Sequence, residues 1–346
     1  MKLERNSGIL LHPTSLPDSP VCGSFGKPAR EWLNELAAFG IGVWQFLPLA
    51  PTDSFGSPYS SPSSFALNPW FLDQNDLVRD GFLANNLEDF SSANDCFKNR
   101  VDFHLANSKV KSLRFSLVDD WYKQNRTIQE EFEIWCSKQF WLDDHSIFME
   151  LKIQNNDLPW WEWPDEYAGR DKKELENWKK NNQRELLGHK LLQWHLDRQW
   201  QSIRELAKNL GIYLFGDVPF YVSKDSADVW GNRSLFSILT NSDTFLQSGV
   251  PPDYFSETGQ LWGNPVYRWS RHKASRYRWW RKRISRHLEQ VDFLRLDHFR
   301  ALEAFWAIPG KDKTAENGLW LPSPGKQILS LIKKDCCGSL PLIAED

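Results

Sequence analysis

The chain has 346 residues, with 42 Lys or Arg against 45 Asp or Glu, which gives a formal net charge of -3. This near balance offers no basic surface for nucleic acid or for an anionic membrane, so a neutral partner is expected. The length allows either one large barrel with insertions or two domains.

The cysteines and the N-terminus indicate a compartment. An odd number of cysteines without a CxxC pair favours a reduced, cytoplasmic protein with no structural metal. Residues 1–7 lack the apolar region of a signal peptide, and no apolar run is long enough to span a membrane. Without a phosphate-binding glycine loop or a zinc spacing, no cofactor is expected. The five cysteines are Cys22, Cys96, Cys136, Cys336 and Cys337.

The first part of the chain predicts two strands joined by a helix. Residues 7–14 form a short apolar run, and residues 28–39 carry apolar side chains at helical spacing before a glycine. A second apolar run follows at residues 43–49. Directly after it, the proline-rich loop of residues 51–68 would present Tyr59 in a fixed position at the mouth of a site.

The middle of the chain predicts an insertion. Residues 76–184 are too many for a plain crossover and are rich in polar helix formers, so we expect an inserted helical subdomain between residues 1–75 and 185–346. Residues 185–210 then follow a 3.6-residue apolar stripe. The apolar run of residues 212–217 that comes next predicts a third strand.

The last part of the chain repeats the helix and strand order. A helix at residues 274–290 precedes a strand at 293–297, and a shorter helix at 326–334 precedes a strand at 340–344. Before them, residues 251–265 mix aromatic, amide and glycine residues, which is typical of a lid loop over a carbohydrate.

The alternation of helices and apolar strands predicts the fold. Strands that are apolar on both faces and are joined by helices form parallel sheets with right-handed crossovers. We therefore expect an α/β fold of the (β/α)8 TIM-barrel type with helical insertions, of which about the first five strands are present. The basic stretch of residues 276–286 is interpreted as a solvated helix face.

Two carboxylates end predicted strands. Asp297 and Glu345 each follow an apolar run, and two carboxylates held close together are the minimum apparatus for cleaving a glycosidic bond. Arg295 would point to the same side as Asp297 and would keep it ionised, so that Asp297 attacks while the other group donates a proton. Helix N-caps or buried ion pairs are equally open alternatives for both carboxylates.

Further polar and aromatic residues suit a sugar site. His298 could donate a hydrogen bond to a sugar hydroxyl, and Asp217 would lie on the same rim, although a packed histidine and a turn aspartate are the plainer interpretations. The chain has 19 Trp, whose flat faces suit sugars. For most of them, however, a place in the core is the simpler expectation.

Several segments together give the chain a resemblance to the 4-α-glucanotransferases of glycoside hydrolase family 77, the amylomaltases or disproportionating enzymes. The segments follow the family's order along the whole chain, which makes them more specific together than any one alone. They are residues 7–17, 44–68, 216–230, 251–269, 293–299 and 343–346.

The resemblance implies transfer of a segment of an α-1,4-glucan to glucose or to another glucan, so maltooligosaccharides and α-1,4-glucans are the expected partners. It implies that Asp297 is the nucleophile and Glu345 the acid and base. The loop of residues 251–265 would favour transfer by excluding water from the glycosyl intermediate. The implied substrate-binding residues are Tyr59, Asp217, Trp262, Asn264, Arg295 and His298.

The chain departs from the family at its end. Family members continue past the Ile-Ala-Glu-Asp segment to further strands and a third catalytic aspartate, whereas nothing follows Asp346 here. We therefore expect a truncated barrel, with a second polypeptide as a possible source of the missing strands. A catalytically incomplete glucan-binding fragment is the alternative, and a hydrolase of the α-amylase type is a weaker one.

Overall fold

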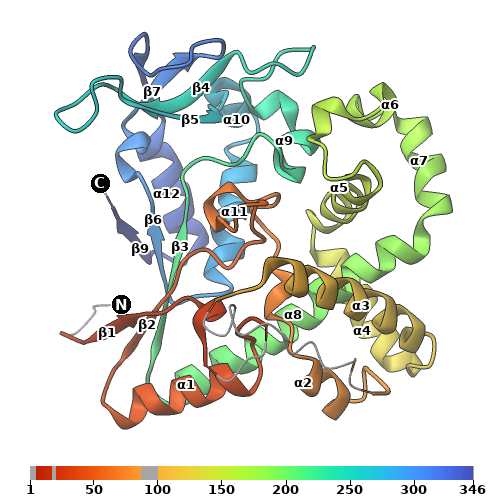
Figure 1. Ribbon diagram of the computed structural model, residues 1–346. Coiled ribbons are helices and arrows are strands. Elements are labelled where there is room, and N and C mark those ends of the chain that lie inside the picture. Colours follow the sequence, from red (N-terminus) through yellow and green to blue (C-terminus); the bar gives the residue numbers. More distant parts are fainter. Residues whose placement is uncertain (1–4, 18–20, 86, 88–99, 346) are drawn as a thin grey trace.

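The structure is a computed structural model that describes residues 5–17, 21–85, 87 and 100–345. Two sheets and a layer of helices make up the described part (Figure 1). Cys96 and Asp346, which entered the sequence argument, lie outside the described residues. No helix in the described ranges is long and apolar enough to cross a membrane.

The first sheet has five strands and is parallel throughout, as the alternation of helices and strands predicts. Its spatial order is β1-β2-β3-β6-β9, so β1 and β9 are its edges in the described structure. Each strand falls within or close to one of the predicted apolar runs, but several are shorter. The strands are β1 (Gly8–Leu10), β2 (Val43–Gln45), β3 (Tyr213–Val218), β6 (Phe293–Leu296) and β9 (Leu342–Ala344).

Four helices each come before a strand of this sheet. The glycine after α1 and the glycine after α8 have φ of +69° and +72°, a conformation that glycine adopts without strain, and each turn leads the chain towards the next strand. The helix predicted at residues 274–290 begins only at Arg278, because Arg276 and Tyr277 before it both have positive φ. The helices are α1 (Lys27–Ala38), α8 (Gln183–Asn209), α11 (Arg278–Leu288) and α12 (Gly325–Asp335).

The predicted insertion is helical where it is described, and α8 joins it to the sheet. Helices α3, α4, α5 and α7 of this region pack along α8, which also contacts α1 and β3. A single hydrophobic cluster runs through both parts. The inserted helices are α2 (Gln74–Arg79), α3 (Phe103–Trp121), α4 (Arg126–Lys138), α5 (Leu142–Gln154), α6 (Asp165–Ala168) and α7 (Lys172–Asn181).

Two glutamines of α8 hold the loop that returns from the Tyr59 region. The side-chain amide of Gln193 donates to the carbonyl of Leu67 and accepts from its N–H at 2.8 and 2.9 Å. Gln199 makes the same pair of bonds with the backbone of Asp73, at 2.8 and 2.9 Å. These side chains therefore satisfy backbone groups of a buried loop that no strand pairs with.

The second sheet was not predicted. It is antiparallel, in the order β5-β4-β7-β8, and it contains β4 (Leu246–Val250), β5 (Gln260–Pro265), β7 (Ala304–Pro309) and β8 (Leu319–Pro322). The prediction of a loop over residues 251–265 is therefore corrected, because its second half is β5, paired with β4. A register shift in this hairpin and several glycines and prolines hide the two-residue period.

The remaining elements are short. Most are single turns that reorient the chain between the longer helices and strands, and η2 and η3 lie on either side of the buried segment near Phe65. They are η1 (Pro13–Ser15), η2 (Pro58–Ser60), η3 (Pro69–Phe71), η5 (Trp160–Glu162), α9 (Ala227–Gly231), η6 (Arg233–Leu235), α10 (Trp269–Ala274) and η7 (Phe299–Leu302).

Tryptophans supply much of the core. Most are buried, and Trp44 and Trp200 are fully so. Their indole N–H groups donate to the carbonyls of Leu11 and Gln290, at 2.8 and 2.9 Å, so burial leaves neither donor unpaired. The tryptophan content is therefore mainly a packing feature of this fold.

The interpretation of residues 276–286 as a solvated helix face is wrong for two of its arginines. Arg283 and Arg286 of α11 have only 0% and 4% of their surface exposed. Arg286 binds Asp197 through two hydrogen bonds, of 2.6 and 3.0 Å, and Arg283 donates to backbone carbonyls. Partners supplied from distant parts of the chain make this burial possible, and the local sequence does not contain them.

Candidate active site

The carboxylates predicted at strand ends meet at one edge of the parallel sheet. Asp217 lies in β3 opposite Arg295 in β6, and Arg295 in turn lies opposite Ile343 in β9. Asp297 and Glu345 come directly after β6 and β9. Because the carboxyl ends of neighbouring parallel strands share an edge, the register itself brings these side chains together.

Arg295 is the common partner of the three carboxylates. Its Nη1 donates to Asp217 Oδ2 at 2.6 Å, and its Nη2 lies 3.2 Å from Asp297 Oδ1 and 3.0 Å from Glu345 Oε1. Burial opposes the charge of Arg295, but the carboxylates outweigh it and raise the pKa of the guanidinium. One cation thus serves three acids, and the cluster keeps excess negative charge.

Glu345 is held mainly by backbone. The N–H of His298 donates to Glu345 Oε2 at 3.2 Å, and the N–H of Phe299 donates to the Glu345 carbonyl at 2.8 Å. His298 has a φ of +54°, in the left-handed region, at the turn that follows β6. The hydrogen bond from His298, followed by the charge of Arg295, lowers the pKa of Glu345.

Asp297 has the opposite shift. Burial raises its pKa to about 6, helped by the negative charges of Asp217 and Glu345 and opposed by Arg295. The carboxyl groups of Asp297 and Glu345 also act on each other, which raises the pKa of Asp297 and lowers that of Glu345. Arg295 favours the ionised form of Asp297, as expected, but burial and the two neighbouring acids outweigh it, because Arg295 divides its charge among three acids.

Tyr59 closes the cluster from the side of β2. It lies in η2, and its hydroxyl donates to Asp217 Oδ2 at 2.8 Å. Burial raises the pKa of Tyr59, so the phenol stays a donor. Burial also raises the pKa of Asp217, which is 4% exposed and whose Oδ1 has no hydrogen-bond partner in the described ranges. That buried oxygen therefore has an unused capacity to accept a hydrogen bond.

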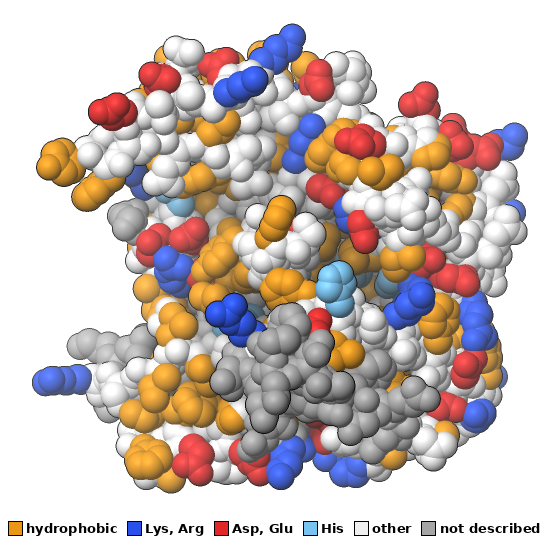
Figure 2. Space-filling view, in the orientation of Figure 1, with side chains coloured by type: hydrophobic (Ala, Val, Ile, Leu, Met, Phe, Trp, Pro, Cys, Tyr) orange, Lys and Arg blue, Asp and Glu red, His pale blue; other side chains and the backbone are white. Residues whose placement is uncertain are grey.

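Aromatic side chains of β5 and the adjoining hairpin form another wall. Trp262 is 37% exposed, and its ring lies edge-on to His298 with centroids 4.9 Å apart. The tip of the same hairpin carries Tyr254 and Phe255, which are 97% and 92% exposed, and Figure 2 shows hydrophobic side chains projecting there. Asn264 is half-buried on β5, and within the described part of the chain no hydrogen bond joins it to the acids.

Sequence reasoning missed two residues that support this cluster. Tyr221 is buried with its ring 6.2 Å from that of Trp262, and Arg283 contacts the backbone that follows Asp217. Tyr221 lies within residues 216–230, one of the segments that carry the resemblance, but nothing in its spacing marked it. Arg283 lies within residues 276–286, a basic stretch that was interpreted as a solvent-exposed helix face.

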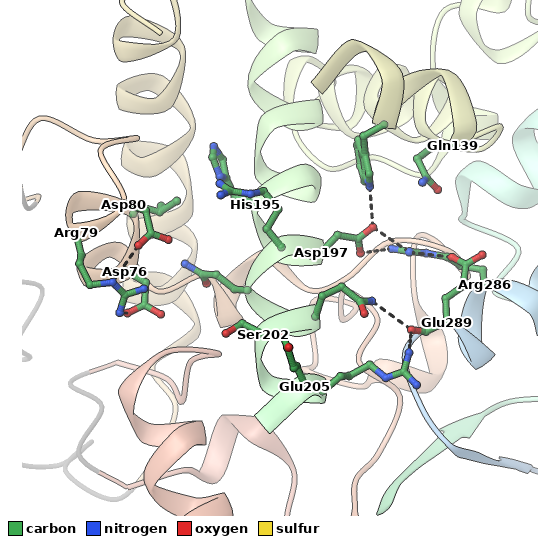
Figure 3. A pocket seen from close by; sticks show the side chains of 16 residues that line it. Asp76, Arg79, Asp80, Gln139, His195, Asp197, Ser202, Glu205, Arg286 and Glu289 are labelled. Carbon is green, nitrogen blue, oxygen red and sulfur yellow. Dashed lines mark hydrogen bonds and ion pairs between the residues drawn. The ribbon is translucent and has the colours of Figure 1, made fainter. Parts of the chain in front are cut away.

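A separate cavity of about 730 Å³ lies among α2, α8 and the end of α11 (Figure 3). Its lining does not include Asp217, Asp297 or Glu345, and its own carboxylates Asp76 and Asp197 are bound by Arg79 and Arg286. In the described ranges, no group of three or more His, Cys, Asp or Glu could hold a metal ion.

Paired carboxylates, an arginine and exposed aromatic rings at the carboxyl edge of a parallel sheet form a site suited to glycosidic bonds. A family model described as 4-alpha-glucanotransferase, glycoside hydrolase family 77, matches residues 11–346. The chain belongs to this family.

Individual relatives agree with the family match. A 4-alpha-glucanotransferase of Synechocystis is 41% identical over 99% of this chain and 68% of its own length, and one of Thermus thermophilus is 38% identical over 100% and 68%. The structure of a Streptococcus agalactiae amylomaltase in complex with acarbose is also similar. It has a TM-score of 0.88 at 33% identity, over 99% of this chain and 69% of that one.

Proposed function

We propose that this chain is a 4-α-glucanotransferase that moves a segment of an α-1,4-glucan to the 4-position of glucose or of another glucan. The observation that carries the proposal is the carboxyl pair of Asp297 and Glu345, both bridged by Nη2 of Arg295 at 3.2 and 3.0 Å. The names of the relatives, from bacteria and plants, support the same reaction.

The mechanism follows from a pair that holds one proton. Below a pH of about 6, the raised pKa of Asp297 and the lowered pKa of Glu345 leave that proton on Asp297 in the free protein. A bound sugar between the two groups would separate them, since retaining enzymes hold such carboxyl groups about 5 to 5.5 Å apart. The proton then passes to Glu345, and ionised Asp297 becomes the nucleophile.

Double displacement uses each group twice. Glu345 protonates the leaving glycosidic oxygen while the Asp297 carboxylate attacks the anomeric carbon, which forms a covalent glycosyl intermediate. Glu345, now ionised, takes the proton from the 4-hydroxyl of the acceptor as that oxygen displaces Asp297. The bond configuration is inverted twice and therefore retained.

The other predicted residues would bind the donor sugar. Asp217 Oδ1 offers an acceptor, and Tyr59 holds Asp217 in place. Trp262 and His298 offer an apolar edge and a donor next to the acids. The exposed rings of Tyr254 and Phe255 at the hairpin tip would cover the bound glucan and exclude water. Asn264 is proposed to bind glucan on the strength of the resemblance alone.

The parallel sheet is proposed to be part of a (β/α)8 barrel. The similarity to the amylomaltase structure supports this, and so do the exposed edge strands, since Leu10 of β1 is 56% exposed. Further strands would pair at β1 and β9, and a second polypeptide is one proposed source of them.

The test is to incubate the purified chain with maltotriose and separate the products. Transfer predicts maltooligosaccharides longer than maltotriose together with glucose, at little net gain of reducing ends. A rise in reducing ends without longer products would identify a hydrolase instead. Binding of maltoheptaose in calorimetry without any turnover would contradict the proposed transfer and favour a glucan-binding protein.

A further inference from the structure

A buried arginine lies behind the two segments that carry Asp217 and Tyr59. Arg283 of α11 is 0% exposed. Its Nη1 donates to the carbonyl of Phe220 at 2.8 Å, and its Nη2 donates to the carbonyl of Pro219 at 2.7 Å. These carbonyls belong to the backbone immediately after β3, the strand that holds Asp217, so Arg283 fixes the exit of that strand.

A second donor acts on the same backbone. The hydroxyl of Tyr267 donates to the carbonyl of Phe220 at 2.7 Å, and Arg283 Nη1 lies 3.3 Å from that hydroxyl. Tyr267 is itself buried, and its ring stacks on Tyr221 with centroids 5.9 Å apart. The segment after β3 is thus bound on its carbonyl side and packed on its side-chain side.

Arg283 differs from the other buried arginine of α11. Arg286 forms a bidentate ion pair with Asp197, whereas no carboxylate lies within 4.0 Å of Arg283 in the described ranges. A buried guanidinium whose partners are mostly neutral carbonyls is costly unless its fork of donors is well used. Here the two Nη groups of Arg283 bind the carbonyls of two successive residues and hold them in one geometry.

The Tyr59 loop rests on the same face of α11. A small cavity is lined jointly by Tyr59, Pro219 and Arg283. Within this loop, the N–H of Ser64 donates to Asp228 Oδ2 at 2.7 Å, and the charge of Arg283 attracts Asp228. The segment that carries the donor, Tyr59, and the segment that carries the acceptor, Asp217, are therefore both next to Arg283.

We propose that Arg283 is a positioning residue that aligns Asp217 with Tyr59 and Arg295. This inference deepens the proposed function and rests on it. It does not place Arg283 in contact with a sugar. Its prediction is that loss of the guanidinium lets the backbone after β3 move, so that Asp217 Oδ2 no longer receives both the Tyr59 hydroxyl and Arg295.

The experiment compares Arg283→Met and Arg283→Lys with Arg281→Lys as the matched control. Arg281 lies on the same helix but binds Asp335, through two hydrogen bonds of 2.6 Å. This pair does not include the acids of the site. For the Met variant we expect kcat/KM with maltotriose to fall about 100-fold, the effect of misplacing a site by roughly 1 Å. The Lys variant should lie between it and wild type, and the control should stay within about two-fold.

A second measurement separates positioning from loss of stability. Displacement of Asp217 moves a negative charge away from Asp297, which lowers the pKa of Asp297. The basic limb of the kcat/KM profile should therefore move to lower pH in Arg283→Met. A change in stability alone would lower the amount of active protein and leave that limb unmoved. A folded Arg283→Met variant with unchanged kcat/KM and an unchanged limb would overturn the inference.

Two further controls keep the result interpretable. If Arg283→Met does not fold, Tyr267→Phe removes the other donor to the Phe220 carbonyl and should give a smaller change in the same direction; no change there would overturn the inference. If the wild-type chain shows no transfer, the proposed function fails. The inference is then decided by a crystal structure of the variant, in which an unchanged Tyr59–Asp217 distance of 2.8 Å would contradict it.

Discussion

Two clusters in this molecule combine arginine and carboxylate in different proportions. In the helical layer, Arg114 lies 2.5 Å from Glu150, which also contacts His189 at 3.0 Å, and all three are buried. At the sheet edge, Arg295 alone faces three carboxylates, of which the Asp297 and Glu345 side chains are 35% and 39% exposed. The first cluster is balanced, and the second is not.

The pKa values show what the difference does. Burial by itself would raise the pKa of Glu150, but the hydrogen bond with His189 and the charge of Arg114 lower it to about 2. At the sheet edge, burial and the surplus of negative charge raise the pKa of Asp297 to about 6. A balanced cluster fixes a charge, whereas an unbalanced one keeps a proton that can be moved.

The largest effect should come from removing an acid of the unbalanced cluster. Glu345→Gln keeps the shape but removes the proton donor, so we expect transfer from maltotriose to fall by about 1,000-fold or more. Glu303→Gln, an exposed position in the next part of the chain, is the control and should leave transfer unchanged. Substantial activity in Glu345→Gln would refute the role given to this residue.

Removing the acid of the balanced cluster should act on stability. Glu150→Gln leaves Arg114 buried without a counter-charge, so the free energy of unfolding should fall by about 4 kcal/mol in urea melts at neutral pH. Glu130→Gln, which breaks an exposed pair with Arg126, should cost less than about 1 kcal/mol.

The same cluster sets a pH window for stability. The pKa of Glu150 is lowered in the folded state, from 4.5 to about 2, so its contribution is present above 4.5 and is lost as the pH falls towards 2. The difference in stability between wild type and Glu150→Gln should therefore shrink over that range. A constant difference would contradict this account.

Asp228 should show the opposite dependence. Burial raises its pKa from 3.8 to about 6, so the stability it contributes is full below 3.8 and falls as the pH rises through 6, by about 3 kcal/mol. Asp228→Asn can still accept from the Ser64 N–H and should remove this slope. Thermal melts of both proteins from pH 4 to pH 7 make the comparison.

The smallest expected effect is a shift in the activity profile. In the free protein, the pair of Asp297 and Glu345 holds one proton up to a pH of about 6, so kcat/KM should fall above that value as both groups ionise. Asp217→Asn removes a negative charge that raises the pKa of Asp297. The basic limb of the profile should then move to lower pH, beside a loss of activity, and an unmoved limb would argue against this coupling.

The sequence identified the parallel sheet and the strand-end acids because both depend on local patterns. Apolar runs after helical stripes locate β3 and β6, and a carboxylate at the end of such a run lies at the rim by geometry. The direction of the pKa shift at Asp297 could not be predicted, since it depends on how Arg295 is divided among acids from three strands. The antiparallel sheet was missed because the register shift between β4 and β5, and Gly263 within β5, obscure the alternation of apolar and polar residues.

The burial of Arg283 and Arg286 could not be predicted from the residues next to them in the sequence either. Arg283 and Arg286 belong to a stretch rich in charge, and their partners lie at Pro219, Phe220 and Asp197, far away in sequence. A run of charged residues predicts solvent-exposed side chains when the same segment contains no residues of opposite charge to pair with them. The roles of the individual site residues stay predictions until variants are measured.

The two glutamines of α8 require the chain that returns from the Tyr59 region to match the helix in length. Gln193 and Gln199 are six residues apart, as are Leu67 and Asp73, and six helical residues rise about 9 Å. Adding or deleting one residue in either span would break the match of lengths and leave backbone amides of the loop unbonded. Natural or engineered length variation should therefore be excluded from both spans.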